Sequence, residues 1–422
     1  MTDTLNKSVP SKSQRIQAGL AKRYRAEKRF RLYGIAAIAA PISFLAIMLV
    51  VIGSRGVGAF QQTYAQLSIT FDEQYITDND WQGIVKASLR ETFPDVSARR
   101  DKKKLYKLMS SGAGFDLQAM YKIDPTLLGQ TRTVWLPMSD DIDMLMKGKI
   151  DRALAEGDRR VSDKELVWID HLIANDVIDL QFNTRFFTSG DSREPELAGI
   201  AGAFMGSILS LAVCFILSFP LGVMTAVYLE EFAPKNTWTY IIEVNINNLA
   251  AVPSIVFGLL GLAIFLNFFM LPRSAPLVGG MVLALMTLPT IIIASRAALR
   301  AVPPSIREAA YGMGASQVQT VLHHVLPLAM PGMLTGTIIG MAQALGESAP
   351  LLMIGMVAFI VDIPGNFTDP ATALPIQIYL WADSPERAFS ERTAAAILVL
   401  VGFLIMMNLI AVIVRKKFER RW

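Results

Sequence analysis

The chain has 422 residues, of which 52% are hydrophobic and only 18% charged. Soluble domains average about 25% charged residues. Here the uncharged residues gather in long runs, which excludes an ordinary soluble protein and indicates an integral membrane protein. The net charge of +4 comes from Lys and Arg that flank these runs, so it does not argue for a nucleic-acid partner. The single cysteine, Cys214, excludes an intrachain disulfide.

Six apolar runs each reach the roughly 20 residues that a helix needs to cross a bilayer. We expect helices because a helix satisfies its own backbone hydrogen bonds in lipid. The runs cover residues 33–53, 197–229, 244–272, 274–295, 325–346 and 393–414. The first is too long for a cleaved signal peptide. Residues 348–361 are too few to span, and Pro350 marks a break, so this stretch is a bent extension of the fifth span or a half-inserted segment.

The charged segments predict the orientation. Residues 1–32 and 415–422 carry an excess of Lys and Arg, whereas residues 362–391 are mostly acidic. Positive charges favour the cytoplasmic side, so both basic segments should lie in the cytoplasm. Residues 54–196 should then lie outside the membrane, and the loops 230–243 and 296–324 should lie inside.

Residues 54–196 have the size of a domain, and their patterns predict an α+β fold. Apolar residues alternate from Ala65 to Phe71, which predicts a strand, and residues 131–136 and 178–187 also have strand character. Residues 81–92 and 102–121 have helical character. Ser162 and Glu165 have the spacing of a capping box and predict a helix to Asn175.

A basic cluster lies within the helical stretch of this domain. It contains Arg99, Arg100, Lys102, Lys103, Lys104 and Lys107. Such a cluster attracts an anion or an acidic partner, or it is simply the solvated face of a helix; the second interpretation is the commoner one.

The inner loop contains Glu308-Ala309-Ala310, then Gly314 and, thirteen residues later, Pro327. Ser305 and Glu308 have capping-box spacing after Pro303-Pro304, which predicts a short helix. Gly314 permits the turn that ends this helix. Ser316 and Gln319 predict a second short helix, which Pro327 should limit. The loop is therefore expected to form a compact helix-turn-helix elbow against the membrane.

This pattern resembles the EAA loop of ABC-importer permeases. The matching residues are Glu308, Ala309, Ala310, Gly314, Leu326 and Pro327, and His324 stands where the family pattern has Ile. The resemblance covers the core 197–414, with the loop at 303–327. It implies an all-α polytopic membrane protein of the type I ABC-importer permease fold, with the exterior α+β domain inserted. It also implies that the loop docks into a cleft of an ATPase subunit.

Two further segments resemble phosphate ABC-importer permease subunits of the PstA type. They are residues 249–258, LAAVPSIVFG, and residues 343–352, QALGESAPLL. Ala251 stands for the family's Gly, Gln343 for its Arg and Ser348 for its Thr. The resemblance implies a phosphate importer of the bacterial inner membrane. Residues 54–196 also resemble an N-terminal extension found in a subset of phosphate permeases.

The same resemblance implies the partners. They are a second permease subunit (PstC type), a cytoplasmic ABC ATPase dimer (PstB type) and an exterior phosphate-binding protein (PstS type), besides membrane lipid. The chain has no GxxxxGK[ST] phosphate loop, so ATP is expected to be hydrolysed by a partner, and this chain should be neither an enzyme nor the holder of a cofactor. His323-His324 lacks further ligands at metal spacing, so no metal site is expected.

The fifth span carries the candidate transport residues. Gly332, Gly336 and Gly340 make one face small, which suits a partner helix, the pathway or packing within the subunit. Glu347 repels phosphate, so we expect it to balance a cation or to act as a gate, unless it sits among headgroups. Gln343 can donate hydrogen bonds without charge.

Arg296 closes the fourth span. It faces the pathway or, as the preferred interpretation, extends to the headgroups.

Two alternatives remain open. The first is a permease for another oxyanion. The second, a membrane-anchored receptor, is disfavoured because the inner loops are short.

Overall fold

The computed structural model describes residues 12–418. The chain forms two compact units, residues 1–54 and residues 55–422. The first consists of most of the helix α1 (Lys12–Gly56), which contains the expected span 33–53. This helix has 45 residues, about 68 Å at 1.5 Å per residue, so it is much longer than a bilayer requires.

The second unit begins with a three-stranded antiparallel sheet in the order β2-β1-β3. The strands are β1 (Gln61–Thr70), β2 (Thr131–Pro137) and β3 (Ile178–Phe182). Ala65, Leu67 and Ile69 are buried on one face of β1, and Phe71 continues their row into the core. The strand predicted from this alternation is confirmed, because side chains two apart share one face of a strand.

Helices pack around the sheet and complete its core. They are α2 (Glu73–Thr77), α3 (Trp81–Thr92), α4 (Arg99–Tyr106), α5 (Ala113–Ile123), α6 (Asp140–Met146) and α7 (Asp163–Ala174). The short helix α8 (Thr184–Thr188) belongs to a separate core, where Phe186 packs with residues of α17 (Leu374–Ala382) and α18 (Ala388–Phe418). The helix 81–92 is confirmed. The capping box of Ser162 and Glu165 is present at the start of α7, so that prediction is also confirmed.

Two predictions in this region are wrong. The helical stretch 102–121 is two helices, because Met109 forms a bridge with Met138 and the Ser110 N–H donates to Pro137 O at 3.0 Å. The strand 178–187 ends at Phe182, because Asn183 caps α8: its Oδ1 accepts from the Phe186 N–H at 3.1 Å. In the first place pairing with a distant strand interrupts the helix, and in the second a local hydrogen bond at a helix end outweighs the apolar pattern.

The rest of the unit is a helical bundle. It contains α9 (Ala201–Val227), α10 (Thr237–Ala250), α11 (Ser254–Gly261), α12 (Pro276–Arg300), α13 (Pro304–Gly312), α14 (Gln317–Thr320), α15 (Leu326–Gly346), α16 (Ala349–Met353), α17 (Leu374–Ala382) and α18 (Ala388–Phe418). Within residues 12–418, five helices are long and apolar enough to cross a membrane, or up to six if one bent pair is a single span.

The bent pair corrects the predicted span 244–272. Its two halves, Thr237–Ala250 and Ser254–Phe268, meet at 102°. Pro253 lies at the break, where it lacks an N–H and disfavours helical backbone at the residue before it. The segment is therefore a broken helix and not one straight span.

The small helix α16 packs against α11. A Cβ at Gly258 would lie 2.7 Å from Pro350 Cα and 2.9 Å from Met353 Cβ, so only glycine permits this approach. The stretch 348–361 is a separate short helix followed by a turn at Gly355, whose φ is +89°. Because α15 ends at Gly346 and the backbone of Glu347 is extended, Glu347 lies in the gap between two helices.

Candidate functional site

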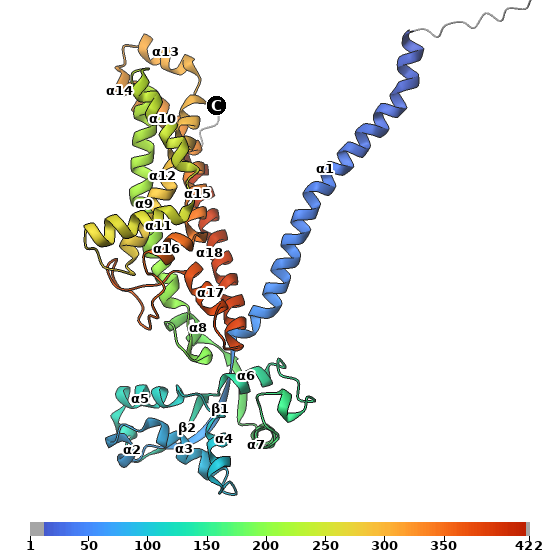
Figure 1. Ribbon diagram of the computed structural model, residues 1–422, viewed down its shortest axis with the longest axis vertical. Helices are drawn as coiled ribbons and strands as arrows, with labels where there is room; N and C mark the ends of the chain where they lie inside the picture. Colours follow the sequence, from blue (N-terminus) through green and yellow to red (C-terminus); the bar gives the residue numbers. More distant parts are fainter. Residues whose placement is uncertain (1–11, 419–422) are drawn as a thin grey trace, which may run out of the picture. The chain divides into compact units, whose positions relative to one another are not determined.

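The predicted elbow is present, with α13 and α14 joined through Gly314. These helices lie at the end of the bundle opposite to the sheet (Figure 1). Gly314 has a φ of +84°, which favours glycine. Ser316 and Gln319 form the predicted capping box, with the Ser316 N–H donating to Gln319 Oε1 at 2.9 Å and the Gln319 N–H donating to Ser316 Oγ at 3.3 Å.

Two details of the predicted elbow are wrong. Ser305 does not cap α13; the helix begins one residue earlier, at Pro304, whose fixed φ suits the first turn. Pro327 does not limit the second helix, which runs from Gln317 to Gly346. A π-helical turn, Val321–Val325, ends two residues before Pro327, which lies in the first turn of α15, and this local change in the hydrogen-bond ladder accommodates the missing N–H.

The elbow presents apolar side chains to solvent. Tyr311 is 47% exposed, Met313 77%, Val318 53% and Leu322 50%. Glu308 and Ala309 are exposed, whereas Ala310 is buried and Leu326 and Pro327 are half-buried. No ion pair or side-chain hydrogen bond joins Glu308 to another residue between 12 and 418. This face has the mixed apolar and charged character of a protein-docking surface.

Arg296 is paired within the bundle and does not extend toward headgroups as expected. Its Nε lies 3.3 Å from Glu230 Oε2, and its Nη2 lies 2.7 Å from Glu243 Oε1. Glu230 also binds Arg300, at 2.8 Å. Sequence patterns do not indicate this pairing, because the carboxylates lie on other helices. Arg296 therefore ties α12 to α10 and to the end of α9.

The small face of α15 packs on α12. A Cβ at Gly332 would lie 2.6 Å from Ala298 Cβ, and one at Gly336 would lie 2.1 Å from Ala294 Cβ. Gly340 has ordinary contact distance, 3.5 Å, to Thr287 Cβ. Of the interpretations left open, packing within the subunit fits this geometry, since small residues let helices approach closely.

The two other candidates lie at the far end of α15. Gln343 is exposed on its last turns, and Glu347 is half-buried just after the helix ends. No ion pair or side-chain hydrogen bond within residues 12–418 reaches Glu347, so the cation that the sequence led us to expect does not come from this part of the chain. The segments 249–258 and 343–352, far apart in sequence, meet where α11 packs on α16.

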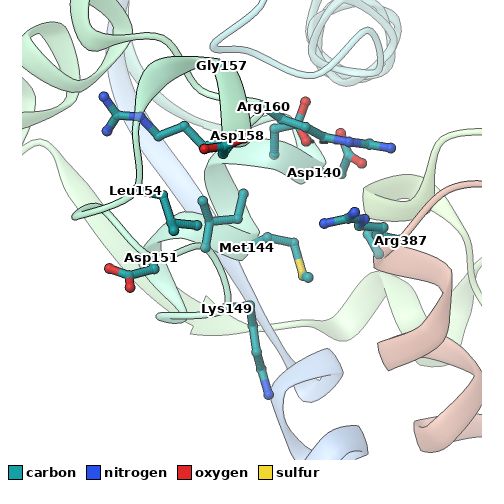
Figure 2. A pocket seen from close by; sticks show the side chains of 13 residues that line it. Asp140, Met144, Lys149, Asp151, Leu154, Gly157, Asp158, Arg160 and Arg387 are labelled. Atoms are coloured by element: carbon teal, nitrogen blue, oxygen red, sulfur yellow. Dashed lines mark ion pairs between the residues drawn. The ribbon is translucent and has the colours of Figure 1, made fainter.

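Figure 2 shows a pocket of about 270 Å³ next to the start of α18. Its charged lining has both signs. The acids are Asp140, Asp141, Asp151 and Asp158, and the bases are Lys149, Arg159, Arg160 and Arg387. Arg160 pairs with Asp141 at 3.6 Å and with Glu386 at 3.7 Å. Because the opposite charges balance, the pocket favours neither an anion nor a cation.

Glu196 makes the stability of the α/β part, the sheet with the helices packed on it, depend on pH. Burial raises its pKa from 4.5 to about 7, against the opposing hydrogen bond from Ser110 Oγ at 2.6 Å. In the unfolded chain the carboxyl ionises first as the pH rises. The contribution of Glu196 to the stability is therefore greatest below about pH 4.5 and falls by up to about 3 kcal/mol as the pH approaches 7. Thermal unfolding at pH 5 and pH 7.5 measures this loss.

The matched variant is Glu196→Gln, which cannot ionise. We expect a smaller loss of stability between the two pH values, although not zero, because burial also raises the pKa of Asp140 to about 6. Equal pH dependence of wild type and variant would contradict the role of Glu196.

The C-terminal half of the chain matches a known family. Residues 218–422 match the family described as binding-protein-dependent transport system inner membrane component. The phosphate transport system permease protein PstA 1 of Mycobacterium tuberculosis (strain CDC 1551 / Oshkosh) is 33% identical over 226 residues, which are 53% of this chain and 72% of that protein. The chain belongs to this family. It is thus a permease and a multi-pass protein of the inner membrane.

Other proteins are also similar to parts of the permease. The phosphate transport system permease protein PstA of Pasteurella multocida (strain Pm70) is 28% identical over 51% of the permease and 76% of its own length. A chain of the MetNI methionine ABC transporter covers 52% of the permease and 96% of itself, with 19% identity and a TM-score of 0.41. Residues 17–156 match a second family, described as a domain of unknown function (DUF3333).

Proposed function

We propose that this permease is one subunit of an ATP-driven importer that carries inorganic phosphate across the bacterial inner membrane. The observation that carries the proposal is its similarity to PstA phosphate permeases over about 72% of their length. It is supported by the contact between the segments 249–258 and 343–352, which resemble PstA segments and pack together in the fold. The closest alternative is another oxyanion, because sulfate or molybdate has the same shape and similar charge.

The elbow is the dock for a separate ATPase. Its support is the positive φ of Gly314, the capped second helix and the exposed Tyr311, Met313 and Val318. Aromatic and methionine side chains are enriched where proteins bind one another. The partners are an ABC ATPase dimer, a second permease subunit and an exterior phosphate-binding protein. In this scheme the permease binds no cofactor, and the partner hydrolyses ATP.

The topology has six spans, with α10 and α11 counted together as one. Both termini and the elbow face the cytoplasm, and residues 54–196 lie outside. The elbow and the sheet lie at opposite ends of the helical bundle, which supports this arrangement (Figure 1). A cysteine at Lys103, in a Cys214→Ser background, should react with an impermeant thiol reagent on intact spheroplasts; reaction only after lysis would reverse the topology.

The transport cycle depends on two conformations of the transmembrane helices that differ in their affinity for phosphate. ATP-driven closure of the ATPase moves the elbow, and the attached helices re-orient around the ligand. Broken helices often lie beside transport sites, because irregular backbone in a membrane must be buried in protein or line a cavity. We therefore assign Gln343 and Glu347, beside the breaks of α10–α11 and α15–α16, to the translocation path.

The substrate is tested by uptake. The permease, expressed with its genomic neighbours in cells that lack their own phosphate importers, should import labelled phosphate in an ATP-dependent way. Excess sulfate or molybdate should not compete. The permease should also co-purify with an ATPase and a second permease. Inhibition by sulfate or molybdate, with no inhibition by unlabelled phosphate, would replace phosphate by another oxyanion.

Glu347→Gln tests the translocation path. The change keeps the size of the side chain and removes its charge. No cation within residues 12–418 pairs with Glu347. We therefore expect its cationic partner in another subunit of the importer. Uptake should fall by at least about tenfold, a difference of about 1.4 kcal/mol. The control Glu347→Asp keeps the charge and should retain more uptake. Normal uptake with glutamine would place the residue among headgroups.

A further inference from the structure

The end of α9 connects the elbow to the bundle through two neighbouring glutamates. They lie in the π-helical turn Tyr228–Phe232, where one extra residue enters the helical turn. Glu230 binds Arg296 and Arg300 of α12, whereas Glu231 binds Arg307 of α13. Adjacent carboxylates thus bind two different elements, one a long apolar helix and the other the first helix of the elbow.

Arg307 makes four hydrogen bonds. Its Nη2 donates to Glu231 Oε1 at 2.6 Å, and its Nε donates to Oε2 at 3.4 Å. Its Nη1 donates to Val302 O at 2.9 Å, and its Nη2 also donates to Leu299 O at 3.0 Å. Leu299 lies in the last turn of α12 and Val302 two residues after its end, where carbonyls have lone pairs that no helical N–H uses. Arg307 therefore connects the elbow to α9 and α12 together.

The second helix of the elbow reaches the same residue. The Nε2 of Gln317, the first residue of α14, donates to the backbone oxygen of Glu231 at 2.5 Å. Glu231 consequently binds both arms of the elbow, one through its carboxylate and one through its carbonyl. Its side chain is only 9% exposed, and that of Arg307 is 21% exposed. A bidentate, charge-assisted pair of this kind fixes orientation as well as distance.

We propose that Glu231 is the positioning residue that transmits movement of the elbow to the transmembrane helices. The Glu231–Arg307 pair holds α13 against the end of α9, and the Glu230 pairs join that same end to α12. A push on the elbow then displaces α9 and α12 as one body. This proposal rests on the proposed function, in which an ATPase docks on the elbow.

The test uses three variants and one control. Glu231→Gln and Arg307→Gln each remove one charge of the pair, and the double variant removes both. Lys235→Gln is the control: it removes an exposed charge on the same loop, and no ion pair or side-chain hydrogen bond within residues 12–418 involves Lys235. The readouts are co-purification of the ATPase, the number of ATP molecules hydrolysed per phosphate imported, and hydrogen exchange of residues 304–320 in the purified full chain.

Both single variants should keep the ATPase bound, and the ATP hydrolysed per phosphate should rise about tenfold. The double variant should be no worse than either single variant, because the pair acts as a unit. Hydrogen exchange of residues 304–320 should become faster in the purified variants, and Lys235→Gln should match wild type in all three readouts.

Unchanged hydrogen exchange together with a wild-type ATP ratio would overturn the proposal, and so would additive single effects. A wild-type complex that binds no ATPase would refute the proposed function, and this proposal with it. If the wild type imports phosphate normally, and the variants import it with the same number of ATP molecules hydrolysed per phosphate, only the Glu231 proposal is refuted.

Discussion

Gly314→Val should reduce phosphate import by about tenfold or more while the chain still inserts into the membrane. Gly314 joins the two arms of the elbow at a φ of +84°. A residue with a Cβ is strained there by about 1–2 kcal/mol, and a β-branched side chain is strained more. The turn then opens, and α13 and α14 no longer present one surface to the ATPase.

The control is Gly312→Val, two residues earlier. A Cβ at either glycine would meet nothing within 4 Å, but only Gly314 has a positive φ. Comparison of the two variants therefore isolates the effect of backbone strain, because neither added side chain begins with a steric clash. Gly312→Val should have the smaller effect. Import and ATPase co-purification are measured together. Full import and normal ATPase association in Gly314→Val would show that the elbow is not the dock.

Arg392→Met should destabilise the folded chain by about 1–3 kcal/mol, because it leaves the buried acceptors of Arg392 without this hydrogen-bond donor. Arg392 is 4% exposed and lies at the start of α18. Its Nη2 donates to Gln62 Oε1 on β1 at 2.9 Å, and its guanidinium lies over the Phe186 ring. Loss of the guanidinium leaves Gln62 Oε1 and the Ala198 carbonyl without this donor.

The neighbouring residue Glu391 belongs to a second set of buried polar contacts. Lys147 Nζ lies 3.6 Å from Glu391 and 2.6 Å from Asp143, and Asp143 accepts from both the N–H and the hydroxyl of Thr63 at 2.8 Å. These contacts join α6 and β1 to α18. The α/β part is therefore fastened to the last transmembrane helix by buried polar groups.

Thermal unfolding in detergent measures the loss. Arg387→Met is the control, because Arg387 is exposed and lies just before the same helix. We expect a larger fall in Tm for Arg392→Met than for Arg387→Met, since substitutions of exposed residues usually change the stability by less than about 0.5 kcal/mol. Equal Tm values for the two variants would mean that the buried hydrogen bonds of Arg392 do not hold α18 to the sheet.

Local patterns determined much of the fold. The alternation in β1, the helix Trp81–Thr92 and the capping boxes at Ser162 and Ser316 were all predicted and are present. So is the turn at Gly314. Each of these features depends on residues within a few positions of one another, where side-chain spacing and backbone preference act directly.

The predictions of helix boundaries were wrong where a local sequence pattern is compatible with two structures. Pro327 was expected to end a helix and is instead accommodated after a π-helical turn, whereas Pro253 interrupts a run that looked continuous. Ser305 and Glu308 have the spacing of a capping box, yet Pro304 starts the helix. Neighbouring elements decide between such outcomes, because packing energies exceed the preference of one residue.

The sequence by itself determined the membrane class, the apolar runs, the elbow and the family resemblance, since these are recorded in composition and short-range spacing. Only the tertiary structure decided which polar side chains meet. Three contacts join residues far apart in the chain: Arg296 with Glu243 (53 positions), Arg307 with Glu231 (76 positions) and Arg392 with Gln62 (330 positions). No sequence period specifies such pairs, because their distance is set by how helices and strands pack and not by their separation along the chain.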